Sequence, residues 1–319
     1  MNQMKVTCVE KYVLLDQKFT FDFPVEYTEH QYLTQQEFEQ QVHDQDIIIV
    51  SDLIVTDAVL KNNPNLKLLA LCSTGYNHVD LVLMKQHDVR VCNIRGYAGD
   101  AVAEHAFTFM INLIKQFPAQ VAGVEQNAWA KGSSGFYLAA PMRELQNKTL
   151  VILGKGEIGL SLAKKAQAFG MQVIFSERQG ARSCREGYVP FDDALAQADI
   201  LSLHCELNAE TRQFINADVL AKMKAGSLLI NVGRGGLVDQ DAVIAAIESG
   251  HLAGYGADVL DQEPPPVDHP LVVLQQKHPN VMLTGHVAWA TDEAQQRLFD
   301  ILQNNVNAFV AGQPQNVVA

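Results

Sequence analysis

The chain has 319 residues, more than a single hydrophobic core normally serves, so its length predicts two domains. Hydrophobic residues make up 48% of it and charged residues 19%, a balance that excludes a disordered or fibrous protein. The formal net charge of -12 at pH 7 argues against nucleic acid or an anionic membrane as a partner. A local cluster of positive groups must therefore hold any anionic ligand.

The N-terminal segment and the cysteines bear on location and redox state. The segment MNQMKVTCVEKYVLL does not have the pattern of a secretory signal, and no run of about 18 apolar residues indicates a membrane span. The cysteines form no CxxC pair and lie scattered at positions 8, 72, 92, 184 and 205. We therefore expect a cytoplasmic protein with reduced thiols and without a disulfide framework or a metal site.

The first ~100 residues are predicted to form one small α/β unit. From Asp46 onward, short apolar runs alternate with helix-like stretches, in the order DIIIVSD, TDAVLKNNP, LKLLALCSTG, DLVLMKQH and VRVCN. This alternation is typical of a parallel sheet whose strands are joined by crossover helices.

A long helix is predicted next. Apolar residues recur at three- and four-residue spacing at Val102, Ala106, Phe109, Leu113 and Phe117, and Pro118 marks the expected end. Residues 123–146 contain Gly, Ser and Pro with weak periodicity, so we expect a connecting segment there.

A second and larger alternation follows. Six apolar runs occur, in the order TLVILG, MQVIF, ILSLH, SLLINV, AGYGADV and NVMLTG, which predicts a doubly wound parallel sheet over residues 101–288. The last segment begins with Thr291 as a predicted N-cap and shows Leu298, Leu302 and Val306 on one face of a helix. This helix trails a complete domain, so we expect residues 289–319 to pack with residues 1–100.

Three glycines between the first strand and first helix of this domain indicate a dinucleotide site. Gly154, Gly156 and Gly159 have the GxGxxG spacing. The first allows a tight turn, the second lets a pyrophosphate approach the backbone, and the third lets helix and strand pack closely. The free N-H groups at the helix N-terminus would bind the phosphate, although a purely structural glycine turn is the alternative.

The choice between NAD and NADP depends on the end of the next strand. Glu177 follows Gly159 by 18 residues, where a carboxylate accepts the ribose hydroxyls of NAD. Arg178, Arg182 and Arg185 lie just beyond and are able to receive a 2'-phosphate, or are simply solvated arginines. We expect NAD as the cofactor, with NADP as the alternative.

Three polar residues stand where ligands of open α/β sheets bind, at the carboxyl ends of predicted strands. Arg234 follows SLLINVG, Glu263 follows GYGADVLDQ, and His286 follows VMLTG. A histidine suits proton transfer near neutral pH, a neighbouring carboxylate raises the pKa of that histidine, and an arginine holds and polarises a 2-oxo acid. A surface histidine, a solvated turn acid and a structural ion pair are the alternatives.

The motifs together resemble one family, the D-isomer-specific 2-hydroxyacid dehydrogenases. They occur in that family's order and cover nearly the whole chain, as CSTGYNHVD, ELQNKTLVILGKGEIG, HCELNAETRQFIN, LLINVGRGGLVDQDAVIAAIESG, GADVLDQEPP and GHVAWAT. The resemblance implies two Rossmann-like domains. One is a flavodoxin-like catalytic domain made from residues 1–100 and 289–319, and the other is an NAD-binding Rossmann domain of residues 101–288.

The same resemblance implies roles for individual residues. Arg234 holds the substrate, His286 is the acid/base and Glu263 pairs with it. Asp258 receives the nicotinamide carboxamide. The backbone amides of Ser73, Thr74 and Gly75 grip the substrate carboxylate. The glycines around Arg234 are expected to keep the cofactor near that side chain. The remaining residues of the implied cofactor set are Glu157, Ile158, Cys205, Val232 and Gly233.

The chain departs from the family pattern at a few positions. Gly285 stands where the family often has proline, so the backbone before His286 is less constrained. Glu206 also replaces a frequent proline, and Asn208 and Ala209 replace a frequent Thr-Pro, so the loop near the cofactor is expected to differ in detail.

The substrate and the assembly state are the least specified properties. Trp289 resembles the glycerate dehydrogenase and hydroxypyruvate reductase branch, where it would limit the size of the substrate, although simple aromatic packing is the alternative. We expect NADH-dependent reduction of hydroxypyruvate or glyoxylate, with D-glycerate oxidation as the reverse. A D-lactate-type dehydrogenase and a non-catalytic NADH-sensing protein are the alternatives. The helix beginning near Ala101 resembles the element through which this family forms homodimers, unless it only bridges the two domains.

Overall fold

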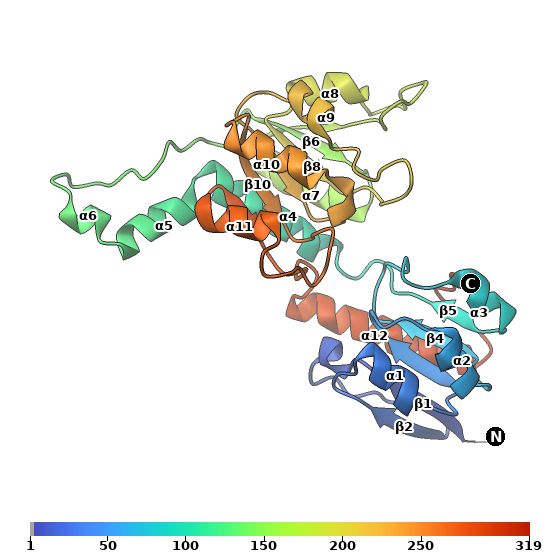
Figure 1. The fold of residues 1–319 in the computed structure, drawn as a ribbon. Coiled ribbons are helices and arrows are strands. Elements are labelled where there is room, and N and C mark those ends of the chain that lie inside the picture. Colours follow the sequence, from blue (N-terminus) through green and yellow to red (C-terminus); the bar gives the residue numbers. More distant parts are fainter. Residues whose placement is uncertain (1–2) are drawn as a thin grey trace. The chain divides into compact units, whose positions relative to one another are not determined.

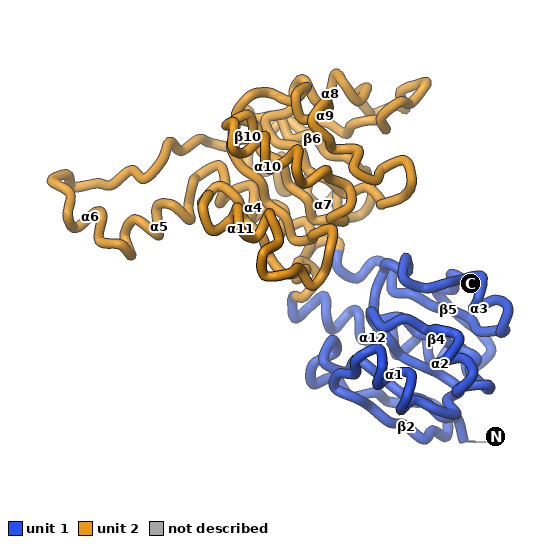
Figure 2. Tube along the Cα trace, viewed as in Figure 1, with its two compact units in different colours: residues 1–98, 291–319 blue, residues 99–290 orange. Residues whose placement is uncertain are grey.

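The computed structural model describes residues 3–319 and divides the chain into two compact units (Figure 2). Unit 1 is Met1–Ala98 together with Thr291–Ala319, and unit 2 is Gly99–Ala290. Each unit contains its own parallel sheet with helices packed against it (Figure 1). The predicted fold class, α/β with two Rossmann-like domains, is confirmed.

The sheet of unit 1 has five parallel strands: β1 (Met4–Cys8), β2 (Val25–Glu29), β3 (Ile47–Val50), β4 (Leu68–Leu71) and β5 (Arg90–Cys92). Their spatial order is β2-β1-β3-β4-β5, the flavodoxin-like order. The sequences IIIV of β3 and LLAL of β4 are buried at every position, because crossover helices cover both faces of a parallel sheet.

The helices of unit 1 are η1 (Lys11–Leu14), α1 (Gln35–Gln41), α2 (Asp57–Asn62), α3 (Leu81–Gln86) and α12 (Asp292–Val310). Helix α12 begins where predicted, because the Thr291 hydroxyl accepts a bond from the Ala294 N-H at 3.2 Å. Its apolar face packs against β4. The chain then returns to β5, where the Val318 N-H donates to the Val91 carbonyl at 2.8 Å, so both ends of the chain build this unit.

The sheet of unit 2 has six parallel strands: β6 (Thr149–Leu153), β7 (Gln172–Phe175), β8 (Ile200–Leu203), β9 (Ser227–Asn231), β10 (Leu252–Ala257) and β11 (Val281–Leu283). Their order is β11-β10-β9-β8-β6-β7, and a single parallel bridge from Ser176 to Val189 extends the β7 edge. The connections reverse direction between β6 and β8, which is the switch point where doubly wound sheets bind ligands.

The helices of unit 2 are α4 (Gly99–Ile114), α5 (Phe117–Glu125), α6 (Ala128–Lys131), α7 (Glu157–Ala168), α8 (Phe191–Gln197), α9 (Ala217–Lys222), η2 (Gly235–Leu237), α10 (Gln240–Glu248) and α11 (Pro270–Lys277). Helix α4 packs on β9, β10 and α7 with its apolar residues buried. Pro118 lies in the first turn of α5 and does not end α4, because the left-handed residue Gln116 separates the two helices. The segment 123–146, predicted as a plain connection, therefore includes the last three residues of α5 and the whole of α6.

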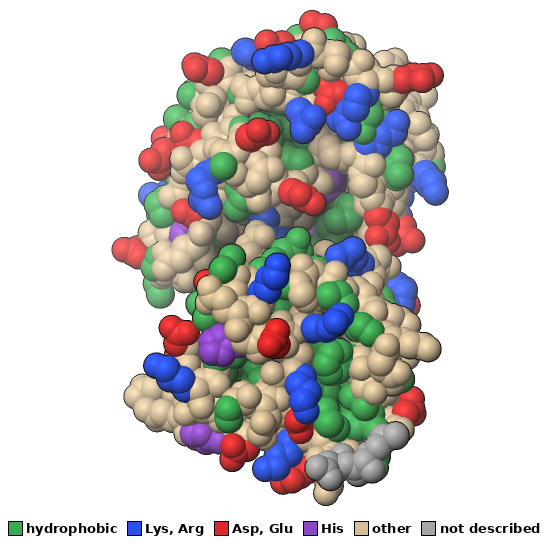
Figure 3. All heavy atoms as spheres, turned by 90° about the vertical axis from the view of Figure 1, so that its right-hand side faces the viewer, with side chains coloured by type: hydrophobic (Ala, Val, Ile, Leu, Met, Phe, Trp, Pro, Cys, Tyr) green, Lys and Arg blue, Asp and Glu red, His purple; other side chains and the backbone are tan. Residues whose placement is uncertain are grey.

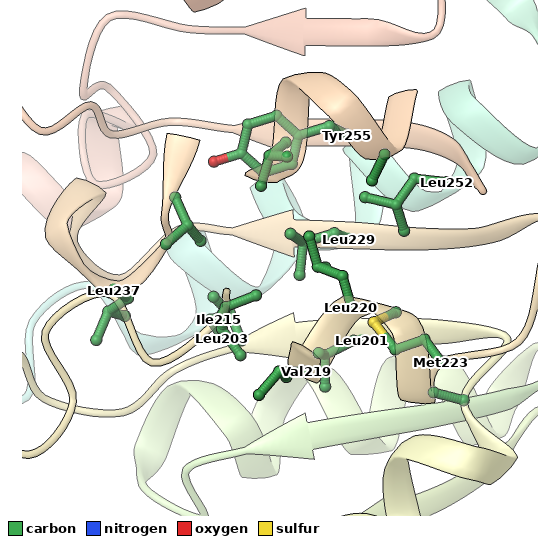
Figure 4. Packing of buried hydrophobic residues seen from close by; sticks show 14 of the residues in the cluster. Leu201, Leu203, Ile215, Val219, Leu220, Met223, Leu229, Leu237, Leu252 and Tyr255 are labelled. Carbon is green, nitrogen blue, oxygen red and sulfur yellow. The ribbon is translucent and has the colours of Figure 1, made fainter. Parts of the chain in front are cut away.

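The core of unit 2 lies between the sheet and the helices α8–α11. Figure 4 shows Leu201, Leu229 and Tyr255 from successive strands packed with Val219 and Leu220 of α9. Burying each such side chain contributes roughly 1.5–3 kcal/mol. This packing holds the strands in place relative to one another. It therefore also positions the loops that follow the strands and carry the predicted site.

The surface and the helices add two observations. On the face drawn in Figure 3, acidic and basic side chains are interspersed with apolar ones. Among residues 3–319, no helix combines the length and the apolar character that crossing a bilayer requires.

Candidate active site

The glycine loop of unit 2 has the tight packing that its spacing predicts. Gly154 follows β6 with φ +108°, and a Cβ atom there would lie 2.4 Å from the His204 carbonyl oxygen. A Cβ atom on Gly159 would lie 2.1 Å from the Gly154 carbonyl oxygen. Neither position accepts a side chain, so these two glycines bring β6, α7 and the end of β8 together.

Gly156 is different, because its missing side chain leaves open space. It is the N-cap of α7, and no side chain of its own caps the helix. A Cβ atom added at Gly156 would meet nothing within 4 Å. The N-terminus of a 12-residue helix therefore faces a free volume, the arrangement that binds a pyrophosphate through N-H groups and the helix dipole. The residues present fit a dinucleotide.

Gly156→Ala should separate folding from cofactor binding. Gly156 has φ -87°, which alanine adopts readily, so we expect a melting temperature within about 2 °C of wild type. The added methyl group would occupy the space of the pyrophosphate, so the Kd for NADH should rise about tenfold or more. Thermal unfolding and NADH titration measure the two effects.

Gly135→Ala is the matched control, because a Cβ atom there also meets nothing within 4 Å and the residue lies outside the glycine loop. If both variants bound NADH equally well, Gly156 would have no role in holding the cofactor.

Glu177 lies just after β7 but is already bonded. Its side chain is only 4% exposed, and the Arg185 guanidinium contacts both carboxylate oxygens at 2.7 and 2.8 Å. The backbone N-H groups of Arg178 and Arg185 donate to the same carboxylate. These contacts hold the pKa of Glu177 at about 2. The sequence pattern did not predict that Arg185 pairs with this carboxylate.

The structure brings the predicted imidazole and carboxylate into contact. His286 lies in the loop after β11 and Glu263 in the loop after β10, and the ends of these neighbouring strands pair at Ala257 and Leu283. His286 Nδ1 lies 2.7 Å from Glu263 Oε2. The second carboxylate oxygen, Oε1, accepts the Leu260 N-H at 2.7 Å, which fixes the orientation of the acid.

Arg234 belongs to the same sheet edge. It follows β9, whose last residue Asn231 pairs with Ala257 of β10. The buried Asn231 side chain holds the loop by donating to the Arg234 carbonyl at 2.9 Å and accepting the Gly233 N-H at 3.1 Å. A Cβ atom on Gly235 would lie 1.9 Å from the Leu260 carbonyl carbon. One glycine beside Arg234 therefore serves to pack the arginine loop onto the loop that leads to Glu263.

The bonds and charges around His286 and Glu263 shift the pKa of both groups. The hydrogen bond to Glu263 raises the pKa of His286 above its ordinary value, against the effects of burial and of the Arg234 charge. Burial raises the pKa of Glu263, but the bonds from His286 and the Leu260 N-H, with the charges of His286 and Arg234, lower it overall. The pair therefore favours an ionised carboxylate beside an imidazolium.

Asp258 organises the loop that carries His286. It is buried, and its backbone carbonyl accepts the His286 N-H at 2.8 Å. Its carboxylate accepts the N-H groups of Val287 and Ala288, both at 2.9 Å, and the Thr284 hydroxyl at 2.5 Å. These bonds hold His286 at φ +57°, a left-handed conformation that is uncommon for a residue other than glycine.

Sequence reasoning missed three supporting residues. His105 of α4 lies 2.9 Å from the Thr284 hydroxyl, across 179 positions of sequence, so no local pattern predicts this contact. Thr284 directly follows β11, where a polar residue is a usable signal. Asn231, the polar end of the otherwise apolar strand SLLIN, is a second such signal.

The other predicted residues lie as follows. The Trp289 indole N-H donates to the His286 carbonyl at 2.9 Å, so this side chain packs on the histidine loop. The remaining residues of the predicted cofactor set lie in the first turn of α7 and just after β8 and β9: Glu157, Ile158, Cys205, Val232 and Gly233. All of these positions are at the carboxyl edge of the unit 2 sheet.

The predicted substrate loop belongs to unit 1 and follows β4. The Ser73 hydroxyl donates to the Gly75 carbonyl at 2.7 Å, and the Asn93 amide donates to the Thr74 carbonyl at 2.8 Å. Within residues 3–319, the backbone N-H groups of Thr74 and Gly75 have no hydrogen-bond acceptor. Two adjacent free N-H groups in a loop whose carbonyls are already bonded are suited to an anion.

Among the described residues 3–319, no three His, Cys, Asp or Glu side chains are grouped as metal ligands would be.

A glycine loop that fits a dinucleotide, and a histidine paired with a carboxylate on the same sheet edge, are the arrangement typical of nicotinamide-dependent oxidoreductases. Residues 107–288 match the model of the D-isomer specific 2-hydroxyacid dehydrogenase NAD binding domain. The chain belongs to that family, its cofactor is NAD, and it is an oxidoreductase of 2-hydroxy acids.

Individual relatives agree with this assignment. The chain is 38% identical to a glycerate dehydrogenase of Methylorubrum extorquens, over 93% of each chain. It is 32% identical to a hydroxypyruvate reductase of Blautia hydrogenotrophica, over 87% of this chain and 86% of that one. Among solved structures, it resembles an NADPH-dependent glyoxylate/hydroxypyruvate reductase of Sinorhizobium meliloti. That match has a TM-score of 0.81 and 26% identity, and it covers 99% of this chain and 98% of the other.

Proposed function

We propose that the protein is a glyoxylate and hydroxypyruvate reductase that uses NADH and also oxidises D-glycerate in the reverse direction. The observation that carries this proposal is the 2.7 Å contact between His286 Nδ1 and Glu263 Oε2, beside the charge of Arg234. The relatives named for glycerate and hydroxypyruvate support the choice of substrate.

The contacts of His286 support different roles for its two ring nitrogens. Nδ1 is bonded to Glu263, so Nε2 is the nitrogen left to give a proton to the carbonyl oxygen of the substrate. The ionised Glu263 stabilises the imidazolium before the transfer and fixes the tautomer afterwards. NADH held by the glycine loop Gly154–Gly159 would supply the hydride for the 2-oxo carbon. In the oxidative direction His286 takes the proton back.

Two further groups are proposed to bind the substrate. The Arg234 guanidinium forms the charged bond to the carboxylate and polarises the carbonyl. In unit 1, the free N-H groups of the loop Ser73–Gly75 bind a carboxylate oxygen. Asp258 is proposed to accept the nicotinamide carboxamide, and Trp289 to restrict the substrate side chain to one as small as that of hydroxypyruvate.

A substrate panel tests the proposal directly. NADH absorbance is followed after addition of hydroxypyruvate, glyoxylate, pyruvate and phenylpyruvate in separate reactions. We expect kcat/KM for the first two to exceed that for phenylpyruvate by about a hundredfold, because Trp289 limits the pocket. A preference for pyruvate or phenylpyruvate would indicate a D-lactate-type enzyme, and no turnover with any of the four would indicate an NADH-sensing protein.

Glu263→Gln should shift the pH dependence of reduction. Reduction needs protonated His286, so its rate falls as the pH rises through the raised pKa of that residue. Glutamine keeps a hydrogen-bond acceptor but removes the charge, so the pKa of His286 should fall and the rate should decline at lower pH than in wild type. The measurement is kcat against pH from 5.5 to 9 with hydroxypyruvate. A variant whose decline stays at the wild-type pH would show that Glu263 does not set this pKa.

We also propose a homodimer. The apolar face of α4 is buried within unit 2, so the predicted contact through that helix needs a different surface. Figure 1 shows α5, α6 and the segment after them extending away from the unit 2 sheet. Large hydrophobic side chains are exposed along this arm: Phe117, Val121, Val124, Trp129, Phe136, Leu138 and Met142. Light scattering at twice the mass of one chain would support the dimer, and a single-chain mass would contradict it.

The cytoplasmic location stays a prediction.

A further inference from the structure

The carboxylate expected to recognise the cofactor ribose has all its acceptor positions filled. Glu177 Oε1 accepts the Arg178 N-H at 2.9 Å and Arg185 Nη2 at 2.8 Å. Oε2 accepts Arg185 Nε at 2.7 Å and the Arg185 N-H at 3.2 Å. An ionised carboxylate has about four acceptor sites, so it can accept the two ribose hydroxyls of NAD only if the Arg185 side chain moves away.

Arg185 is placed so that it can move. Its side chain is 55% exposed, whereas the side chain of Glu177 is 4% exposed, so the guanidinium covers the acid. The guanidinium also lies over the Tyr188 ring, with its central carbon 4.0 Å from the ring centroid. The Tyr188 ring is thus a second contact for the Arg185 guanidinium. Tyr188 directly precedes Val189, which forms the parallel bridge with Ser176.

The charges around this position favour an anion. Arg178 is 79% exposed, and Lys155 of the glycine loop lies 4.9 Å from the centroid of the Phe175 ring and 5.1 Å from that of Tyr188. Arg182 lines the adjoining hollow of about 460 Å³. Asp192 also lines it, but that carboxylate is paired with Lys222 at 2.8 Å.

We infer that Arg185 is a specificity-determining residue that lets this protein bind NADPH as well as NADH, because it neutralises the carboxylate that would otherwise repel a 2'-phosphate. With the ion pair closed, the cofactor site presents guanidinium groups to the phosphate of NADPH. With the pair open, Glu177 accepts the hydroxyls of NADH. The inference concerns cofactor binding and does not depend on the proposed substrate.

Cofactor titration of the wild-type protein tests the first consequence. The fluorescence of the reduced nicotinamide reports the Kd for NADH and for NADPH without any turnover. We expect the two Kd values to lie within about tenfold of each other. A Kd for NADPH more than about tenfold weaker would overturn the inference.

Three variants test the role of Arg185 itself. Arg185→Met leaves Glu177 charged and uncovered, so the ratio of the Kd for NADPH to that for NADH should rise by about tenfold or more. Arg185→Lys keeps the charge but loses the bidentate fork, so its ratio should lie between those of wild type and Arg185→Met. Glu177→Gln removes the repelling charge, so its ratio should fall below the wild-type value.

The control is Lys277→Met, which removes one positive charge from an exposed position in the last turn of α11. Its ratio should equal the wild-type ratio. Circular dichroism verifies that each variant is folded. A ratio for Arg185→Met within about twofold of the control would show that Arg185 does not select the cofactor.

Discussion

His286→Gln should reduce kcat for hydroxypyruvate by about 10²- to 10⁴-fold, because glutamine cannot donate a proton to the carbonyl oxygen. The glutamine amide is still able to donate a hydrogen bond to Glu263, so the loop should stay in place. The Kd for NADH should therefore change by less than about threefold, which separates loss of chemistry from loss of the cofactor site. Stopped-flow measurement of NADH consumption checks the first value, and fluorescence titration the second.

His278→Gln is the matched control. That histidine is the C-cap of α11 and does not belong to the group formed by Arg234, Glu263 and His286. Its kcat should equal that of wild type. If His286→Gln retained turnover within about tenfold of wild type, a difference of only about 1.4 kcal/mol, proton transfer by His286 would be excluded.

Arg234→Met should have the second largest effect, a fall in kcat/KM for hydroxypyruvate of about 10²- to 10³-fold. The thioether removes both the charge that binds the carboxylate and the donors that polarise the carbonyl. Arg234→Lys should recover part of the loss, since it restores the charge but not the planar fork. Initial rates over a range of hydroxypyruvate concentrations separate KM from kcat.

Arg143→Met controls for the loss of a positive charge in unit 2. Its guanidinium donates to the Gly226 carbonyl at 2.8 Å, and it has no contact with the Glu263–His286 pair. Arg234 would be excluded as a substrate ligand if Arg234→Met and Arg143→Met gave the same KM and kcat.

Much of the fold follows from local patterns, because apolar runs such as IIIV of β3 and SLLIN of β9 are buried throughout. The edge strand β2 is harder to predict, since its residues VEYTE are half-buried or exposed and its pairing with β1 depends on tertiary context. Pro118 shows a second difficulty. Proline both follows helices and starts them, and only the left-handed backbone at Gln116 decides between the two.

The candidate site shows a similar division. The residues Arg234, Glu263 and His286 follow three neighbouring strands, so their positions at one sheet edge are predictable from the order of apolar runs. The bonds that orient them are not, because they join distant segments, as His105 and Thr284 do. The Arg185 contact with Glu177 spans only eight residues, but it depends on the path of an irregular loop that has no periodicity.

A crystal structure with NADH and oxamate, an unreactive analogue of a 2-oxo acid, would test the proposed chemistry most directly. We predict His286 Nε2 within hydrogen-bond distance of the oxamate carbonyl oxygen, the Arg234 guanidinium on its carboxylate, and Glu263 still bonded to His286 Nδ1. Oxamate bound without contact to His286 or Arg234 would contradict the assignment of these residues to proton transfer and substrate binding.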